Sequence, residues 1–151
     1  ALMHIYNALI TPHLNYGILA WGKSNHVNQI LKIQKRAVRV ISNAKYNAHT
    51  EPLFKNLGIL KIEDMRKLFE VKFYYNFSAG LLPEYFSTFT QTNLEFHTAH
   101  QTRGRRQLSV PVHRHHFVRS GLRYTIVSTI NNSPHYILQK KNGTHCIRTV
   151  R

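Results

Sequence analysis

The segment between Val27 and Ile41 constrains the fold more than any other part of the chain. Its apolar residues recur every three or four positions, which is the spacing of one face of an α-helix. The pattern predicts a helix from about His26 to Ile41 with one face in a core. Its cationic face is either a solvated surface or a surface that lies along a phosphate backbone. The predicted core face consists of Val27, Ile30, Leu31, Gln34, Val38 and Ile41, and the cationic face of Lys32, Lys35, Arg36 and Arg39.

Proline and glycine punctuate the chain before this helix. We expect a first helix from Leu2 to about Ile10 that is bent or restarted at Pro12, with Thr11 as the capping residue. Gly22 is expected to adopt the left-handed conformation that ends the next helical segment. Trp21, which precedes it, is interpreted as a packing anchor at a corner between helices.

Two further helices are expected after residue 49. Thr50 is expected to be an N-cap, with Glu51 and Pro52 in the first turn of a short helix that ends at Gly58. A longer helix follows from Glu63 to about Phe77, and residues 81–86 fold as a short turn. The short helix is expected to bury Leu53, Phe54 and Leu57, and the long one to carry a stripe of Met65, Leu68, Phe69, Lys72, Phe73 and Phe77.

The rest of the chain has a different composition. Residues 87–106 are polar and predict a loop, residues 108–112 predict an extended edge at most because of Pro111, and residues 117–130 fit either a strand or a helix. The predicted fold class is therefore mainly α. We expect a small irregular bundle of about four helices in residues 1–86, followed by a basic, loop-rich and poorly ordered tail in residues 87–151.

The distribution of charge also distinguishes the C-terminal part of the chain from the rest. Residues 97–151 hold 10 of the 21 Lys and Arg residues and none of the 6 acidic residues. Such a segment repels itself when compact and is stabilised beside a polyanion. We expect nucleic acid as the partner and no membrane, because this segment lacks a wide apolar helical face. The cations expected to meet phosphates from this flexible arm are Arg103, Arg105, Arg106, Arg114, Arg119 and Arg123.

The order of residues in the first part of the chain is similar to a known family. Residues 6–17 (YNALITPHLNYG), 20–22 (AWG) and 31–39 (LKIQKRAVR) resemble a segment of the reverse transcriptases of non-LTR retrotransposons, especially jockey-like elements. In that family the segment follows the polymerase domain and adjoins its thumb. The resemblance continues through residues 49–55 (HTEPLFK) and 57–62 (LGILKI). It implies a C-terminal portion of a reverse transcriptase-like protein.

Farther along the chain the resemblance is confined to short pieces. Residues 97–103 (HTAHQTR) are similar to an H-x-x-x-T-R element of the family. Residues 130–134 (INNSP) depart from the Trp-Asn-Ser-Leu-Pro ending that the family shows at the corresponding place. The implied relationship therefore covers the chain to about residue 85.

The family is an RNA-directed DNA polymerase, and its chemistry needs aspartates that hold two divalent ions. Asp64 is the only aspartate in this chain, and with Glu63 it is better explained as a first-turn charge that favours the helix dipole. We therefore assign no catalytic residue and no metal ligand. A divalent metal is implied only for the polymerase core, which this chain does not contain, and no cofactor is expected here.

Histidines are concentrated in the basic segment, where 7 of the 11 occur. His113, His115 and His116 flank Arg114 and, with His97, His100 or Cys146, offer potential zinc ligands. Neither a helix-borne H-E-x-x-H motif nor paired cysteines are present, and the neighbouring cations oppose a metal ion. The simpler interpretation is polar or pH-dependent contact with phosphate.

Aromatic residues gather near the end of the predicted long helix, at Phe73, Tyr74, Tyr75 and Phe77. Such a cluster can stack on bases, but its usual role is to fill a core. We interpret it as core, with base stacking as the alternative.

The predicted function is binding of template, primer or element RNA through phosphate contacts, beside a polymerase core that is a further expected partner. One alternative is a decayed element remnant or an autonomous helical interaction module with only nonspecific nucleic-acid binding. Another is a histidine-dependent nuclease. With one cysteine, no stretch of membrane-spanning length and no signal-peptide pattern, we expect a fragment of a larger intracellular protein, nuclear or cytoplasmic.

Overall fold

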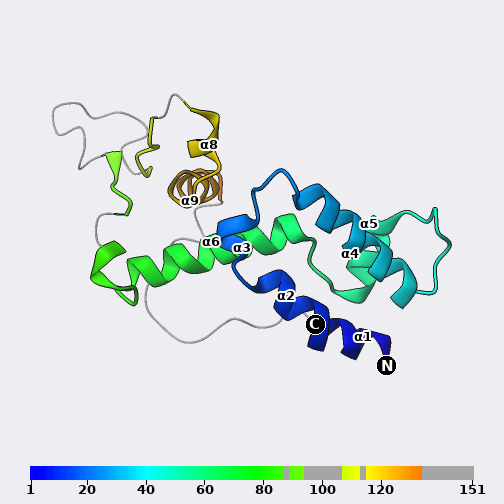
Figure 1. Cartoon of the computed structure of the whole chain (residues 1–151). Helices are drawn as coiled ribbons and strands as arrows, with labels where there is room; N and C mark the ends of the chain where they lie inside the picture. The colour runs from blue at the N-terminus through cyan, green and yellow to red at the C-terminus, as the bar shows by residue number, and fades with distance from the viewer. Residues whose placement is uncertain (87–88, 94–106, 113–114, 134–151) are drawn as a thin grey trace. The chain divides into compact units, whose positions relative to one another are not determined.

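The computed structural model describes residues 1–86, 89–93, 107–112 and 115–133 (Figure 1). The described chain is mainly helical, which confirms the predicted fold class. Its extended pairing within these ranges is a single antiparallel bridge between Thr92 and Leu108. The helical elements are α1 (Leu2–Ile5), the π-helical η1 (Tyr6–Ile10), α2 (Thr11–Asn15), α3 (Ile18–Trp21), α4 (Val27–Ile41), α5 (Thr50–Leu57), α6 (Ile62–Ser78), the 3-10 turn η2 (Glu84–Phe86), α8 (His116–Arg119) and α9 (Leu122–Asn131).

The described residues form two compact units, Ala1–Lys67 and the residues from Leu68 onward. The sequence of α6 runs through this division. The boundary expected at residue 86 separates a segment that resembles a family from a basic segment. This boundary rests on sequence resemblance and charge, and it stays a prediction.

Pro12 shapes the first helical stretch without ending it. A proline inside a helix lacks the N–H that would bond to the fourth residue before it, and its ring crowds that carbonyl. The chain accommodates this with the π-helical turn η1 directly before α2. Thr11 is not the expected N-cap, because it has helical dihedral angles and its hydroxyl donates to the Tyr6 carbonyl at 3.4 Å.

The turn between α2 and α3 differs from the sequence expectation. Gly17, not Gly22, has the left-handed conformation, with a φ of 62°. Gly22 has a φ of −64°, and it is needed for a close approach, since a Cβ there would lie 2.4 Å from the Ile18 carbonyl oxygen. Trp21 is half-buried, and its indole N–H donates to the Tyr16 carbonyl at 2.7 Å. The prediction for Gly22 was wrong, because the sequence does not show which of the two glycines takes the positive φ.

The core of the first unit joins the N-terminal helices, α4 and α5. Its buried side chains are Tyr6, Val38, Phe54 and Ile59. The short helix α5 begins one residue after the N-cap, His49, and ends at Gly58, whose φ of 63° is left-handed. The predicted helix and its end at this glycine are confirmed, whereas the N-cap is His49 and not Thr50, which is the first helical residue. Partly buried residues packed around this core include Met3, Ala37, Ile41, Leu53 and Leu57.

The core of the second unit forms between the later part of α6 and α9. Leu108, Ile126, Val127 and Ile130 are buried there. Residues 122–131 are helical, so the helical alternative for this region is the one the structure shows. Part of the segment that we expected to be a tail therefore contributes a helix with buried apolar side chains.

The stripe predicted for α6 is partly wrong. Leu68 is 53% exposed, whereas Glu70, which the pattern omitted, is 1% exposed and accepts a hydrogen bond from the Thr129 hydroxyl. Ile62 and Met65 are buried in the part of α6 that belongs to the first unit, whereas Val71, Phe73 and Tyr74 pack against the core of the second unit. A single stripe at helical spacing therefore does not predict which side chains of α6 are buried, because its two parts belong to different units.

The aromatic residues of α6 pack against one another and against Phe86 and Phe89. The ring centroid of Phe73 lies 5.4 Å from those of both Phe86 and Phe89. Tyr74 lies 6.3 Å from Phe77, and burial raises the pKa of its phenol. Tyr75 is 58% exposed, whereas Phe73, Tyr74 and Phe77 are half-buried. The packing supports the core interpretation for the cluster over base stacking.

Candidate nucleic-acid interface

Helix α4 presents opposite chemistry on its two sides. Gln34 and Val38 are 2% and 0% exposed, while Lys32 and Arg36 are exposed and Lys35 and Arg39 are half-buried. At 3.6 residues per turn the four cations fall within an arc of roughly 100°. No acidic residue occurs between Val27 and Ile41. The structure therefore gathers the four predicted cations of this helix on one side, away from its buried face.

A buried amide fixes the rotation of α4. The Gln34 Nε2 donates hydrogen bonds to the Tyr6 phenol oxygen at 3.0 Å and to the Leu60 carbonyl at 2.9 Å. Its Oε1 accepts from the Ile62 backbone N–H at 3.1 Å. Burial raises the pKa of Tyr6, although the hydrogen bond from Gln34 opposes this effect. Because buried polar groups are costly to leave unpaired, this network favours one orientation of the cationic face.

One edge of the cationic face meets an acidic group. Glu51 on α5 forms an ion pair with Lys61. The pKa of Glu51 is lowered, chiefly by the hydrogen bond from Lys61 and further by the charges of Lys55 and Lys35. α4 and α5 pack against each other (Figure 1). The charge of Lys35 is thus partly offset by Glu51, which leaves Lys32 and Arg36 as the more available cations.

The C-terminal end of α4 turns back sharply at Asn43. This residue has a φ of 48° and is the only non-glycine with a positive φ in the described ranges. The Ala44 N–H bonds to the Arg39 carbonyl at 2.9 Å, and the Asn43 N–H to the Val40 carbonyl at 3.1 Å. These two bonds make a Schellman motif, with asparagine where glycine is commoner. The motif directs the following residues back along α4.

The returning loop is fixed to the helix a second time. Nε of Arg39 donates to the Ala48 carbonyl at 3.0 Å, and the Ala48 N–H bonds to the Lys45 carbonyl at 2.9 Å. The bond to Ala48 uses one of the five N–H groups of the guanidinium. Arg39 therefore has a structural role, in addition to carrying one of the charges of the cationic face.

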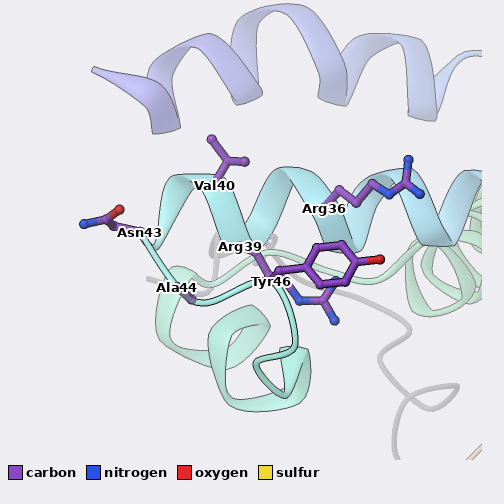
Figure 2. Close-up of a pocket in the computed structure, with 6 residues that line it drawn as sticks. All are labelled: Arg36, Arg39, Val40, Asn43, Ala44 and Tyr46. Atoms are coloured by element: carbon purple, nitrogen blue, oxygen red, sulfur yellow. The ribbon is translucent and has the colours of Figure 1, made fainter.

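A surface hollow of about 470 Å³ lies between the end of α4 and this loop (Figure 2). Tyr46, which is 84% exposed, extends its ring alongside the helix, next to the side chain of Arg39. Tyr46 is not among the predicted site residues, because it lies in a loop without periodicity. The sequence feature that could have identified Tyr46 is its position next to Lys45 and shortly after a basic helix, since aromatic residues among cations are typical of nucleic-acid binding sites. The lining residues are Arg36, Arg39, Val40, Asn43, Ala44 and Tyr46.

A second hollow, of about 270 Å³, has mixed charge. Its lining includes Lys23 and Arg66 but also Glu63, so it suits a phosphate less well. Asp64, on the same helical turn as Glu63, pairs with Lys67 at 3.3 Å. Both acids lie in the first turn of α6, as expected. Within the described residues, no three His, Cys, Asp or Glu side chains are grouped to hold a metal ion.

The remaining predicted phosphate contacts are only partly described. Arg119 on α8 and Arg123 on α9 are exposed and lie on helices, so the expectation of a flexible arm was wrong for these two. Of the potential zinc ligands singled out, His97, His100, His113 and Cys146 lie outside the described ranges, whereas His115 lies within them and is exposed, and His116 begins α8. The arginines outside them are Arg103, Arg105, Arg106 and Arg114.

Wherever the structure is described, its helices are too short or too polar to cross a bilayer. The expected nuclear or cytoplasmic location stays a prediction. In comparisons of the chain with known proteins, no family model, no curated protein and no solved structure matches it.

Proposed function

We propose that the chain is the C-terminal helical portion of a non-LTR retroelement reverse transcriptase-like protein and that α4 binds a nucleic-acid backbone. One observation carries the binding proposal. Four cations share one side of α4, while Gln34 and Val38 hold its other side in a core. The resemblance of the sequence supports the retroelement origin. The chain contributes binding to the assembly, and polymerisation belongs to a separate core.

The dimensions of the cationic face fit a short stretch of one strand. Lys32 and Arg39 are seven residues apart, which corresponds to roughly 10 Å along a helix axis. A DNA strand in a duplex carries one phosphate per roughly 3.4 Å of axis. About three phosphates of one strand therefore lie within reach of the four cations. Such contacts hold a strand in place without reading its bases, so template, primer and element RNA are all suitable ligands.

The test is fluorescence polarisation with a labelled 20-nucleotide RNA across a salt titration. The double variant Lys32→Gln/Arg36→Gln removes the two exposed cations and leaves the Arg39 bond to the loop intact. We expect weaker binding and a salt slope that is shallower by about 1.4, because each lost contact to a single strand removes about 0.7.

The matched control is Lys67→Gln/Lys72→Gln, which removes the same charge from exposed positions on α6. We expect a smaller loss of affinity and a smaller change in slope. Equal changes in the two double variants would show that binding depends on net charge alone and would overturn the assignment to α4. Duplex DNA and an RNA–DNA hybrid, measured in parallel, compare the three ligand classes.

A second candidate function is contact with a polymerase domain. Leu2, Ile5 and Leu9 are 49%, 50% and 61% exposed and recur at intervals of three and four residues. An exposed apolar face of this kind favours a protein partner, and the resemblance supplies the partner to test. Ile5→Lys/Leu9→Lys should reduce capture of a separately produced jockey-like polymerase domain and leave RNA binding intact. Unchanged capture would remove this candidate.

A further inference from the structure

We propose that the hollow at the C-terminal end of α4 binds an unpaired nucleotide, whose base stacks on Tyr46 while its phosphates meet Arg36 and Arg39. This inference rests on the proposed nucleic-acid binding and adds a preference for single strands. It assigns a role to Tyr46, which the phosphate contacts of α4 do not need.

The hollow combines an apolar surface with positive charge. Tyr46 is 84% exposed, and Val40, which also lines the hollow, is 65% exposed. With Ala44 they supply an apolar surface, while the two arginines supply positive charge. Single-strand binding sites combine these features, because bases stack on aromatic rings while cations follow the backbone. Exposed tyrosines are common, so exposure alone would not distinguish Tyr46.

The hollow is already formed in the folded chain. The Schellman motif at Asn43 fixes the start of the loop, and the bond from Arg39 to the Ala48 carbonyl fixes its end. Tyr46 lies between these two points, and Figure 2 shows its ring alongside α4. A site held in this way loses less conformational entropy on binding than a free loop does.

Unpaired nucleotides expose the faces of their bases, whereas a duplex covers them. In a duplex the bases are stacked on their neighbours, and the outer surface presents phosphates and sugars. An unpaired base can be splayed out and stacked on an aromatic side chain. The hollow of about 470 Å³ is of the size that accepts small organic ligands, which suits one nucleotide. The site therefore favours single strands or strand ends.

The test compares Tyr46→Ala with Tyr16→Ala, using a single-stranded 20-nucleotide RNA and a duplex of the same sequence. Tyr16 is a matched control, because it is 85% exposed, lies in the same unit and does not line the hollow. We expect Tyr46→Ala to weaken single-strand binding about 5- to 150-fold, the range for one stacked base. Its salt slope and its duplex affinity should match those of the wild type.

Tyr46→Phe keeps the ring and should retain single-strand affinity, which separates stacking from a hydrogen bond of the phenol. An oligonucleotide carrying 2-aminopurine gives a direct readout, since stacking on Tyr46 should quench its fluorescence in the wild type and not in Tyr46→Ala. Because the side chain is exposed, Tyr46→Ala should fold, which circular dichroism checks.

Three outcomes would overturn the inference: no loss with Tyr46→Ala, equal losses for single strand and duplex, or an equal loss with Tyr16→Ala. In each of these cases, salt-dependent binding that still requires Lys32 and Arg36 would leave the proposed function in place. Absence of nucleic-acid binding by the wild-type chain would overturn both.

Discussion

The side-chain amide of Gln34 donates a hydrogen bond to the phenol oxygen of Tyr6 at 3.0 Å and so joins residues that lie 28 positions apart in the chain. The same amide pairs with backbone groups of Leu60 and Ile62. One polar side chain within an apolar face therefore connects three segments of the first unit. It also determines the direction in which the cations of α4 face.

Replacement of Gln34 by alanine should destabilise the first unit. The change leaves the Ile62 N–H and the Leu60 carbonyl without their partner and creates a cavity, so we expect a loss of roughly 2 to 4 kcal/mol in the free energy of unfolding. Urea denaturation measures it. Gln29→Ala is the control, because Gln29 is exposed on the same helix and its loss should cost less than about 0.5 kcal/mol. Similar losses for both variants would argue against the network.

Tyr6 should make stability depend on pH in the alkaline range. Burial raises its pKa above the usual value of 10.0, so the folded state retains the phenol proton to higher pH than the unfolded state. This contribution is complete below the unfolded pKa and is lost as pH rises through the raised pKa. Tyr6→Phe should cost about 1 kcal/mol near neutral pH through the lost hydrogen bond, and this deficit should shrink in strongly alkaline solution.

The measurement is urea unfolding of the wild type and of Tyr6→Phe from about pH 8 to about pH 11. Tyr16→Phe serves as the control, since Tyr16 is exposed and its replacement should give a constant difference from the wild type. A difference for Tyr6→Phe that does not change with pH would contradict the role of burial.

Some of this arrangement was predictable from the sequence, and some was not. The helix from Val27 to Ile41 and its buried face follow from one repeating pattern, and the short helix ending at Gly58 follows from local composition. Leu68 and Glu70 were misjudged, because the buried side of α6 depends on which element packs against each half of it. Local patterns do not contain that information.

The hollow next to α4 could not be predicted for a related reason. It exists because Asn43 adopts a left-handed conformation and because Arg39 bonds to the loop nine residues later. Asparagine tolerates that conformation but does not require it. The cations of the face were recognisable from their spacing on a helix, whereas the position of Tyr46 depends on the path of the loop.

Asn131 should stabilise the second unit through its side chain. Its Oδ1 accepts from the Leu108 N–H at 3.0 Å, and its Nδ2 donates to the Leu108 carbonyl at 2.9 Å. Asn131→Ala leaves both backbone groups of a buried residue unpaired, and we expect a loss of roughly 1 to 3 kcal/mol in thermal or urea unfolding. Asn132→Ala, at the exposed neighbouring position, should cost clearly less. An equal cost would indicate that the pairing contributes little.

Glu51→Gln should strengthen nucleic-acid binding. The carboxylate of Glu51 interacts with Lys61, Lys55 and Lys35, so its neutralisation releases positive charge at the edge of the cationic face. We expect a few-fold gain in affinity for single-stranded RNA at low salt and a slope steeper by up to about 0.7. Fluorescence polarisation measures both. Glu84→Gln, which removes an exposed acid from η2, is the control, and an equal gain there would attribute the effect to net charge.

The conformation of Asn43 offers a way to test whether the shape of the loop matters for binding. Asn43→Gly keeps the left-handed conformation available and should leave stability and single-strand affinity close to those of the wild type. Asn43→Val places a β-branched residue at a φ of 48°, which should cost roughly 1 to 3 kcal/mol of stability. Because relief of that strain moves the loop that carries Tyr46, single-strand affinity should fall while duplex affinity stays the same. If Asn43→Val bound single strands as tightly as Asn43→Gly, the fixed loop would not be needed for recognition of an unpaired base.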